Sequence, residues 1–434
     1  MSGFFKFPKG FLWGSAVSGH QIEGGNRHSD WWHWELATPT QPFSGKAVDY
    51  WNRYEEDHQL LEELGHQAFR LGIEWARVEP KPNEFDVNVI EHYRRIFESL
   101  QRRKIKICLT LHHWVLPEWV AQKGGWSYSK TVDFFERYSR RMVDEFGDFP
   151  ELWITFNEPM VAALAGYITA DFPPQRHSFF GFRSAVRHML EAHARVYRII
   201  HESKEGARVG IAMAYPWIEP WGSKGVAGWY ERLFVDVAKT WIYRAWDRSV
   251  QTGRVHPLFG FGKIEGLGGS VDFAGINYYF RVTPRASIRH IKRAFFDLEA
   301  IPKGICVSDM GWQIYPEGLY RVLMEVWGRF KKPIFITENG IADGTDAKRD
   351  AYIVSHLQQV YRAIEKQIPV QGYFHWSFID NFEWNEGFSM KFGLVDVDFT
   401  DSELKRKPRR SATMYRKIIQ KNGFFLSDHD NLFG

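Results

Sequence analysis

Cysteine is scarce in this chain of 434 residues, which contains only two, Cys108 and Cys306. Two cysteines cannot build a disulfide framework, and Cys108 lies in an apolar strand pattern where a free thiol behaves as a small hydrophobe. Long apolar runs are missing as well. The amino terminus, Met1 to Lys6, lacks the apolar core of a signal peptide, and no run approaches the length of a membrane span. These absences predict a cytoplasmic protein without a membrane span.

The chain also lacks the motifs that hold metals and nucleotides. It has no His-Glu-x-x-His pair and no cysteine cluster, which argues against a metal site, and no phosphate-cradling Gly-rich loop. The net charge of +4, from 56 basic and 52 acidic residues, is spread along the chain. Short basic runs are more often solvated faces than nucleic-acid footprints. We therefore expect no cofactor, no metal and no nucleic-acid partner.

Aromatic residues, in contrast, are plentiful, at 17% of the chain with 19 Trp. One interpretation is that they fill the core, and composition alone favours it. The other is that some of them form a surface or pocket that stacks on sugar rings, because the apolar C–H faces of sugars suit aromatic platforms.

Apolar segments typical of buried strands alternate with amphipathic helical segments along the chain. Strands are expected at 11–17, 68–75, 105–111, 152–158, 208–214, 271–279, 333–338 and 370–377. Helices are expected at about 51–64, 89–103, 131–146, 184–203, 229–252, 317–329 and 347–367. This alternation predicts an α/β fold, a (β/α)8 TIM barrel with its active site at the C-terminal strand ends. No repeat, low-complexity segment or linker divides the chain, so residues 1–434 are expected to form a single domain.

Two of the expected strands end in a glutamate, Glu338 and Glu158. Glycosidic-bond hydrolysis needs such a pair of carboxylates, one to protonate the leaving oxygen and one to attack the anomeric carbon. Taken singly, each motif has a simpler interpretation, because Asn-Glu-Pro also forms turns and Thr-Glu-Asn-Gly also forms loops. The predicted barrel strengthens the case for a catalytic site, because it brings both carboxylates to one rim together with other polar and aromatic residues. These are Gln21, His113, Asn157, Asn277, Tyr279 and Trp376.

Several motifs, in the same order along the chain, resemble glycoside hydrolase family 1, the β-glucosidase and β-glycosidase family. They lie at 11–14, 21–24, 155–159, 277–279, 336–340 and 376–384, so the resemblance covers nearly the whole chain. The segment Arg70-Leu71-Gly72-Ile73-Glu74-Trp75 resembles the archaeal-type members of the family more than the others.

The resemblance implies roles for individual residues. Glu158 is expected to be the acid/base and Glu338 the nucleophile, with Arg70 and Tyr279 within hydrogen-bonding reach of Glu338. A cation and a donor both favour the ionised nucleophile, whereas the negative Glu338 favours the protonated form of Glu158. The carboxyl groups are expected about 5–5.5 Å apart, which is the retaining geometry.

The same resemblance implies a sugar-binding set. It places Asn157 at the 2-hydroxyl, Gln21 and His113 near the 3-hydroxyl, and Glu383 with Trp384 at the 3-, 4- and 6-hydroxyls. Trp376 would form the platform under the ring and Phe392 an apolar wall near the 6-carbon. Two further rim residues, Trp114 and Asn277, complete the predicted substrate-binding residues.

Glu383 also bears on whether the substrate is phosphorylated. In the branch of the family that cleaves 6-phosphosugars, a small residue replaces this acid, and Lys and Tyr follow seven and nine residues later. Here the glutamate is retained and those places hold Met390 and Phe392. Because a carboxylate repels a phosphate, we expect an unphosphorylated substrate.

These observations predict a retaining exo-β-glycosidase acting on β-D-glucosides, with β-D-galactosides or fucosides as further candidates. Its expected partner is a small-molecule β-glycoside. One alternative is a transglycosylase of the same mechanism, and another is a catalytically silent sugar-binding relative, which the two retained carboxylates disfavour. The apolar carboxyl end, Phe424-Phe425-Leu426, fits a packed tail, which is the commoner case. It also fits a contact that forms a homo-oligomer, or a contact with lipid-like aglycones.

Overall fold

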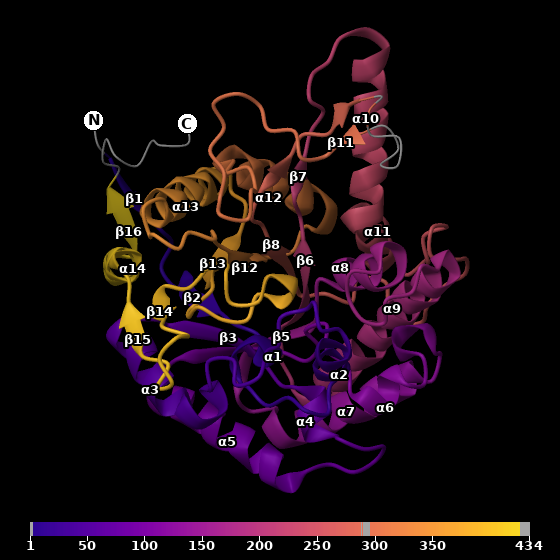
Figure 1. Ribbon diagram of the computed structural model, residues 1–434, viewed down its shortest axis with the longest axis vertical. Helices are drawn as coiled ribbons and strands as arrows, with labels where there is room; N and C mark the ends of the chain where they lie inside the picture. The colour runs from indigo at the N-terminus through magenta and orange to yellow at the C-terminus, as the bar shows by residue number, and fades with distance from the viewer. Residues whose placement is uncertain (1–2, 288, 290–295, 426–434) are drawn as a thin grey trace.

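The computed structural model of the chain describes residues 3–287, 289 and 296–425, and its centre is a closed barrel of parallel strands (Figure 1). Each barrel strand corresponds to one of the expected strands, so the predicted TIM barrel is confirmed. In barrel order they are β2 (Leu12–Ala16), β3 (Ala68–Gly72), β4 (Lys106–Thr110), β5 (Pro150–Asn157), β6 (Val209–Ala214), β8 (Phe273–Asn277), β12 (Ile334–Asn339) and β13 (Val370–Trp376). The barrel closes between β13 and β2, where Gly372 pairs with Leu12 and Trp376 with Ala16.

Helices connect the strands and cover the outside of the barrel (Figure 1). The longer ones are α3 (Tyr50–Glu63), α5 (Val87–Arg102), α7 (Thr131–Phe146), α9 (Phe179–Ser203), α10 (Gly225–Lys239), α11 (Ala245–Thr252), α12 (Pro316–Phe330), α13 (Arg349–Glu365) and α14 (Arg410–Lys421). The local sequence explains where these helices begin and which side of each is buried. In α5, for example, the Asp86 carboxylate accepts hydrogen bonds from the amides of Asn88 and Val89, and Ile90 and Phe97 are buried toward the barrel.

Shorter elements lie in the loops at both ends of the barrel. The short helices are α1 (Gly19–Ile22), α2 (Asp30–Ala37), α4 (Trp75–Val78), α6 (Glu118–Ala121), α8 (Pro159–Leu164), η1 (Gly125–Ser127), η2 (Ala165–Thr169), η3 (Thr240–Arg244) and η5 (Trp384–Glu386). The short strand pairs are β1 (Phe4–Lys6) with β16 (Gly423–Phe425), β7 (Trp217–Ile218) with β9 (Arg281–Val282), β10 (Arg285–Ala286) with β11 (Phe296–Asp297), and β14 (Val395–Val397) with β15 (Arg406–Pro408).

Two expected elements contain a change of backbone geometry in the structure. The strand expected at 68–75 ends at Gly72, and Trp75 begins α4. The helix expected at 229–252 starts at Gly225 and is interrupted by the π-helical turn η3 between α10 and α11. In both cases the apolar pattern continues across a change of backbone geometry, so periodicity alone does not show the change.

Apolar side chains from alternate strand positions fill the barrel interior. Leu12, Ala68, Cys108, Leu152 and Phe273 belong to one buried cluster built from different strands. Cys108 is a buried free thiol, as expected. In the part of the chain that the structure describes, no helix has the length and apolarity needed to cross a membrane, and no group of His, Cys, Asp and Glu side chains is arranged to hold a metal ion.

Candidate active site

Glu338 lies at the C-terminal end of β12, buried with only 3% of its surface exposed. Its two carboxylate oxygens have different partners. Arg70 Nη1 donates to Oε1 at 2.5 Å, and the Tyr279 hydroxyl donates to Oε2 at 2.5 Å. A buried cation and a hydrogen-bond donor both favour the ionised carboxylate. The expected contacts of Arg70 and Tyr279 with Glu338 are therefore present.

Arg70 reaches Glu338 from inside the barrel, where it is fully buried on β3. Its other donors are also used. Nη1 donates to the Thr337 carbonyl at 3.1 Å, Nη2 to Asn157 Oδ1 at 2.8 Å, and Nε to Thr110 Oγ1 at 3.2 Å. A guanidinium held by several acceptors has little freedom, so Arg70 fixes the position of Glu338 relative to β5.

Glu158 follows β5 at the point where the chain turns into α8. Its φ of +44° is left-handed, and Pro159 occupies the first position of the helix. The Glu158 amide donates to the Ala212 carbonyl at 2.7 Å, which ties this turn to β6. The positive φ thus serves to aim the side chain at the rim of the barrel.

The Glu158 carboxyl group is surrounded differently from that of Glu338. Its one hydrogen bond to a side chain comes from Asn277 Nδ2, at 2.9 Å. Burial, followed by the negative charge of Glu338, raises the pKa of Glu158 to about 8. Glu158 is therefore protonated at neutral pH, while its neighbour Glu338 is held in an ion pair.

Asn157 links the carboxyl pair to a histidine at the end of β4. Its Nδ2 lies 2.9 Å from His113 Nε2, and its Oδ1 accepts from Arg70 and from Asn277. Burial and the Arg70 charge hold the pKa of His113 well below its usual value, so the ring is neutral. A neutral His113 that accepts from Asn157 at Nε2 carries its proton on Nδ1 and can donate it to a sugar hydroxyl.

Glu383 lies opposite, in the loop after β13, and is held by Gln21 of α1. Gln21 Nε2 donates to the Phe382 carbonyl at 2.9 Å and to Glu383 Oε2 at 3.3 Å. Burial and the charge of Glu338 raise the pKa of Glu383 to about 8, and hydrogen bonds from Gln21 and Trp376 oppose this rise. Gln21 thus orients Glu383 from outside the lining of the cavity.

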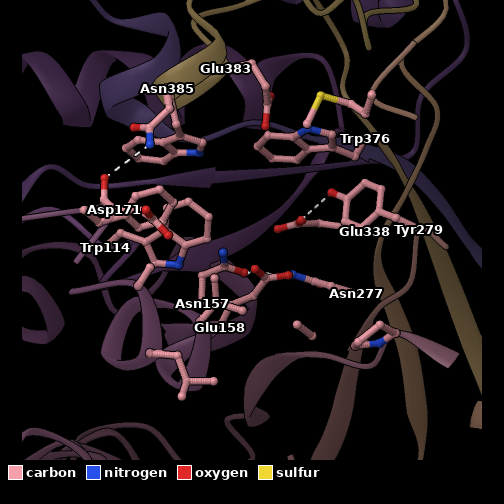
Figure 2. A pocket seen from close by; sticks show the side chains of 18 of the residues that line it. Trp114, Asn157, Glu158, Asp171, Asn277, Tyr279, Glu338, Trp376, Glu383 and Asn385 are labelled. Carbon is pink, nitrogen blue, oxygen red and sulfur yellow. Dashed lines mark hydrogen bonds between the residues drawn. The ribbon is translucent and has the colours of Figure 1, made fainter. Parts of the chain in front are cut away.

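A cavity of about 540 Å³ opens between these groups at the C-terminal end of the barrel. Figure 2 shows Glu338 beside Tyr279, Asn157 with Glu158 and Asn277 below them, and Trp376 and Glu383 above. The predicted site residues that line the cavity are His113, Trp114, Asn157, Glu158, Asn277, Tyr279, Glu338, Trp376, Glu383, Trp384 and Phe392. Arg70 and Gln21 are not among the lining residues and act on them through hydrogen bonds.

The outer wall of the cavity consists of residues that the sequence did not single out. Most are apolar and come from loops and short helices: Val161, Leu164, Phe172, Ile242, Phe280, Met310 and Trp312. At the mouth, Asn385 Nδ2 donates to the Asp171 carbonyl at 3.2 Å (Figure 2). The sequence offered one signal for this wall, the high aromatic content, but not which aromatic residues it contains.

A buried polar network behind α1 was missed as well. Glu74 Oε1 accepts from the His20 amide at 3.0 Å, and Oε2 accepts from Asn26 at 2.8 Å. His20 in turn contacts Glu35, at 2.9 Å. This network holds the segment that carries Gln21, so Glu74 supports the site although the sequence suggested only an archaeal-type variation there.

The fold and this cavity agree with the comparisons with known proteins. The model of the family described as Glycosyl hydrolase family 1 matches residues 5–424. The chain belongs to this family. Like its relatives there, it is a β-glycosidase.

Family 1 relatives of known structure and known name cover almost the whole chain. A β-glycosidase from Pyrococcus horikoshii superposes with a TM-score of 0.90 at 36% identity, over 99% of this chain and 97% of its own. A β-galactosidase from Sulfolobus acidocaldarius is 33% identical over 96% of each chain. β-Glucosidase A from Thermotoga maritima is 32% identical over 96% of this chain and 98% of its own. The relatives thus include archaeal and bacterial family 1 members with different sugar preferences.

Proposed function

We propose that this family 1 β-glycosidase is a retaining exo-β-glucosidase that hydrolyses unphosphorylated β-D-glucosides by double displacement, with β-D-galactosides or fucosides as further substrates. One observation carries the proposal. Two carboxyl groups share one cavity, and their surroundings keep Glu158 protonated and Glu338 paired with Arg70. An acid and a nucleophile in these states are what the first chemical step requires.

In that step the Glu338 carboxylate attacks the anomeric carbon, and the bond to the leaving oxygen breaks as Glu158 transfers its proton to that oxygen. The product is a glycosyl ester of Glu338 and a free alcohol. Ester formation removes the negative charge that contributes to the raised pKa of Glu158. The pKa of Glu158 then falls, and its carboxylate takes a proton from the water that attacks the ester. A carboxyl separation of about 5–5.5 Å is expected for this mechanism.

Sugar recognition is assigned to the other polar groups of the cavity. Asn157 is placed at the 2-hydroxyl, His113 at the 3-hydroxyl and Glu383 with Trp384 at the outer hydroxyls. Gln21 contributes near the 3-hydroxyl by fixing Glu383, to which it is hydrogen-bonded. Trp376 supplies the ring platform, and Phe392 the wall at the 6-carbon. The whole chain, residues 1–434, is taken to be one catalytic domain.

The charge of the cavity supports an unphosphorylated substrate. Among the described residues that line it, none is Lys or Arg, whereas the acidic residues Glu338, Glu383 and Glu386 do line it. A sugar phosphate would bring further negative charge into this cavity without a cation to meet it.

Competition between sugars tests the proposal. We expect kcat/KM for an aryl β-D-glucoside to exceed that for its β-D-galactoside and β-D-fucoside, and the 6-phosphoglucoside to be inert. A preference for the galactoside would change the sugar assignment and leave the mechanism standing. Turnover of the 6-phosphoglucoside would contradict the roles given to Glu383 and Phe392. Binding of glycosides without any turnover would favour a silent sugar-binding relative.

A further inference from the structure

Of the large apolar side chains that the structure describes, the three most exposed are Val226 at 82%, Phe180 at 77% and Phe261 at 76%, and all three lie on or near α9 and α10. On α10, Val226, Trp229, Leu233 and Val237 are between 46% and 82% exposed. Their spacing of three or four residues places them along one side of the helix. A surface helix ordinarily presents polar residues on its outer side, so this exposed apolar stripe needs an explanation.

The stripe is not the side by which α10 attaches to the protein. Tyr230 and Phe234 make that attachment, with ring centroids 4.8 Å and 4.0 Å from Phe296 of β11. The helix is therefore apolar on two sides. One side packs against the β10–β11 hairpin, and no described residue covers the other. Figure 1 shows α10 extending away from the barrel.

The exposed stripe continues onto the start of α9. Trp241, one turn beyond Val237, has its ring centroid 6.0 Å from Phe179 and 5.5 Å from Phe182. Beside them, Phe180 and Phe261 are 77% and 76% exposed. We call this surface the α9–α10 face. Its exposed apolar residues are Phe179, Phe180, Val226, Trp229, Leu233, Val237 and Phe261.

Positive charge accompanies the α9–α10 face. Arg183 lies 5.8 Å from the Phe179 ring, and Arg187 donates to the Phe261 carbonyl at 2.7 Å. Lys224 and Arg232 lie on α10 or next to it. Within the described ranges, no ion pair involves any of these four cations. The acidic residues of α10, in contrast, are engaged, because Glu231 accepts from Ser223 and Asp236 pairs with Arg244.

The π-helical turn η3 connects the α9–α10 face to the wall of the active-site cavity. The π-helical turn η3 directly follows α10 and supplies both Trp241, which extends the face, and Ile242, which lines the cavity. The cavity wall on this side is also apolar, with Leu164 and Phe172. A molecule with a sugar head and an apolar tail could therefore have its head between the glutamates and its tail leading toward the face.

We propose that the α9–α10 face rests on a membrane surface that contains anionic lipids, and that the enzyme takes amphiphilic β-glycosides from that surface. A protruding helix with Trp and aliphatic side chains on one side, flanked by cations without ion pairs, fits an interface of apolar chains and negative headgroups. A second copy of the chain fits less well, because a two-fold contact would bring the same cations close to their counterparts. The substrate part of this inference rests on the proposed function, whereas the docking part does not.

Sedimentation with vesicles tests the docking part. The wild-type chain should sediment with phosphatidylcholine vesicles that contain phosphatidylglycerol, more weakly with pure phosphatidylcholine, and less at high salt. The double variant Trp229→Ser/Leu233→Ser should reduce the fraction bound to the anionic vesicles about tenfold or more. The pair Lys224→Glu/Arg232→Glu should abolish the preference for the anionic lipid. As a matched control, Val87→Ser removes a residue that is 60% exposed on α5, away from the face, and should leave binding unchanged.

The thermal melting curve of each variant shows that it is folded without relying on activity. Equal binding by the double variant, or no binding by the wild type, overturns the docking proposal. So does sedimentation-velocity evidence of a dimer that the double variant abolishes, because a second copy would then cover the face.

A second measurement tests the substrate part. Turnover of a long-chain alkyl β-glucoside embedded in the anionic vesicles should fall about tenfold in the double variant, with turnover of a soluble aryl β-glucoside unchanged. An equal effect on both substrates would contradict surface uptake. Lack of turnover of the soluble glycoside by the wild type, with vesicle binding intact, would reject the proposed function and leave the docking proposal standing.

Discussion

At the scale of single residues, the candidate site contains two buried glutamates with different hydrogen-bond partners. The sequence predicted that Glu158 and Glu338 lie at one barrel rim, because each ends an apolar strand, and both line the cavity in the structure. For Arg70, the resemblance to the family implied a contact with Glu338, and the structure contains this contact. The sequence could not give the role of Glu74, because this role depends on contacts between segments far apart in the chain.

The raised pKa of Glu158 predicts the alkaline side of the pH profile. The acid form acts in the first step, so kcat/KM for a glycoside with a poor leaving group should hold below pH 8 and fall as the pH rises through about 8. Glu158→Gln cannot donate the proton, so its residual activity, about 10²- to 10⁴-fold lower, should show no such fall. If the fall persists in Glu158→Gln, another group, such as Glu383, causes it and the assignment is wrong.

Tyr279 offers a second test at this scale. Tyr279→Phe removes the donor to Glu338 Oε2, and a hydrogen bond to a charged group contributes about 1.5–3 kcal/mol, so kcat/KM should fall about ten- to hundredfold. The neighbouring Tyr278 is a matched control, because it is buried but donates to the Tyr315 carbonyl, outside the site. Tyr278→Phe should lower the melting temperature and leave kcat/KM almost unchanged. Similar kcat/KM values for the two variants would contradict the role of Tyr279.

At the scale of elements, the sequence predicted each barrel strand and most of the helices between the strands, because apolar strands and amphipathic helices have distinct periods. It did not predict α14, which follows the last barrel strand. It failed where geometry changes inside one apolar pattern. The expected strand 68–75 contains the start of α4, and the expected helix 229–252 contains the π turn η3. The side-chain pattern of a π turn differs little from that of the α-helix around it, although the turn places Ile242 in the cavity.

Ile242 therefore tests what η3 contributes. Ile242→Ser removes apolar surface from the outer wall, where the aglycone should lie. At about 0.8 kcal/mol per buried methylene, the loss predicts a roughly tenfold lower kcat/KM for a hexyl β-glucoside. The methyl β-glucoside serves as the control, because its aglycone is too short to reach this wall. An equal loss for both substrates would show that η3 acts on the sugar site instead.

At the scale of the whole molecule, the first and last described strands pair with each other outside the barrel. Strand β1 pairs with β16, and Phe5 stacks on Phe424 at 5.2 Å between ring centroids. Phe424 is therefore packed, as the packed-tail interpretation expects. Phe425 is exposed, and Leu426 lies outside the described residues. The sequence could predict the barrel order, because βα units wind in one direction. It could not predict the pairing of β1 with β16. That pairing depends on where the closed barrel places these two short strands, which are far apart in the sequence.

The pairing of β1 with β16 predicts that substitutions of two adjacent phenylalanines change the free energy of unfolding by different amounts. Phe424→Ala should lower the free energy of unfolding by about 3–5 kcal/mol, because the ring is 5% exposed and packs against Phe5 and Phe7. Phe425→Ala is the control, since its ring is 56% exposed, and it should cost less than about 1 kcal/mol. Urea unfolding of both variants measures the difference. Equal costs would show that β16 does not hold the amino-terminal strand as described.

The central claim, that Glu338 forms a covalent glycosyl-enzyme, is tested most directly by an aryl β-D-glucoside whose products are followed by NMR. The wild type should release the β-anomer first. Glu338→Ala should be inactive until azide is added, because azide can then occupy the space of the missing carboxylate and yield the α-glycosyl azide. Release of the α-anomer first by the wild type, or azide-independent activity of Glu338→Ala, would contradict the double-displacement account.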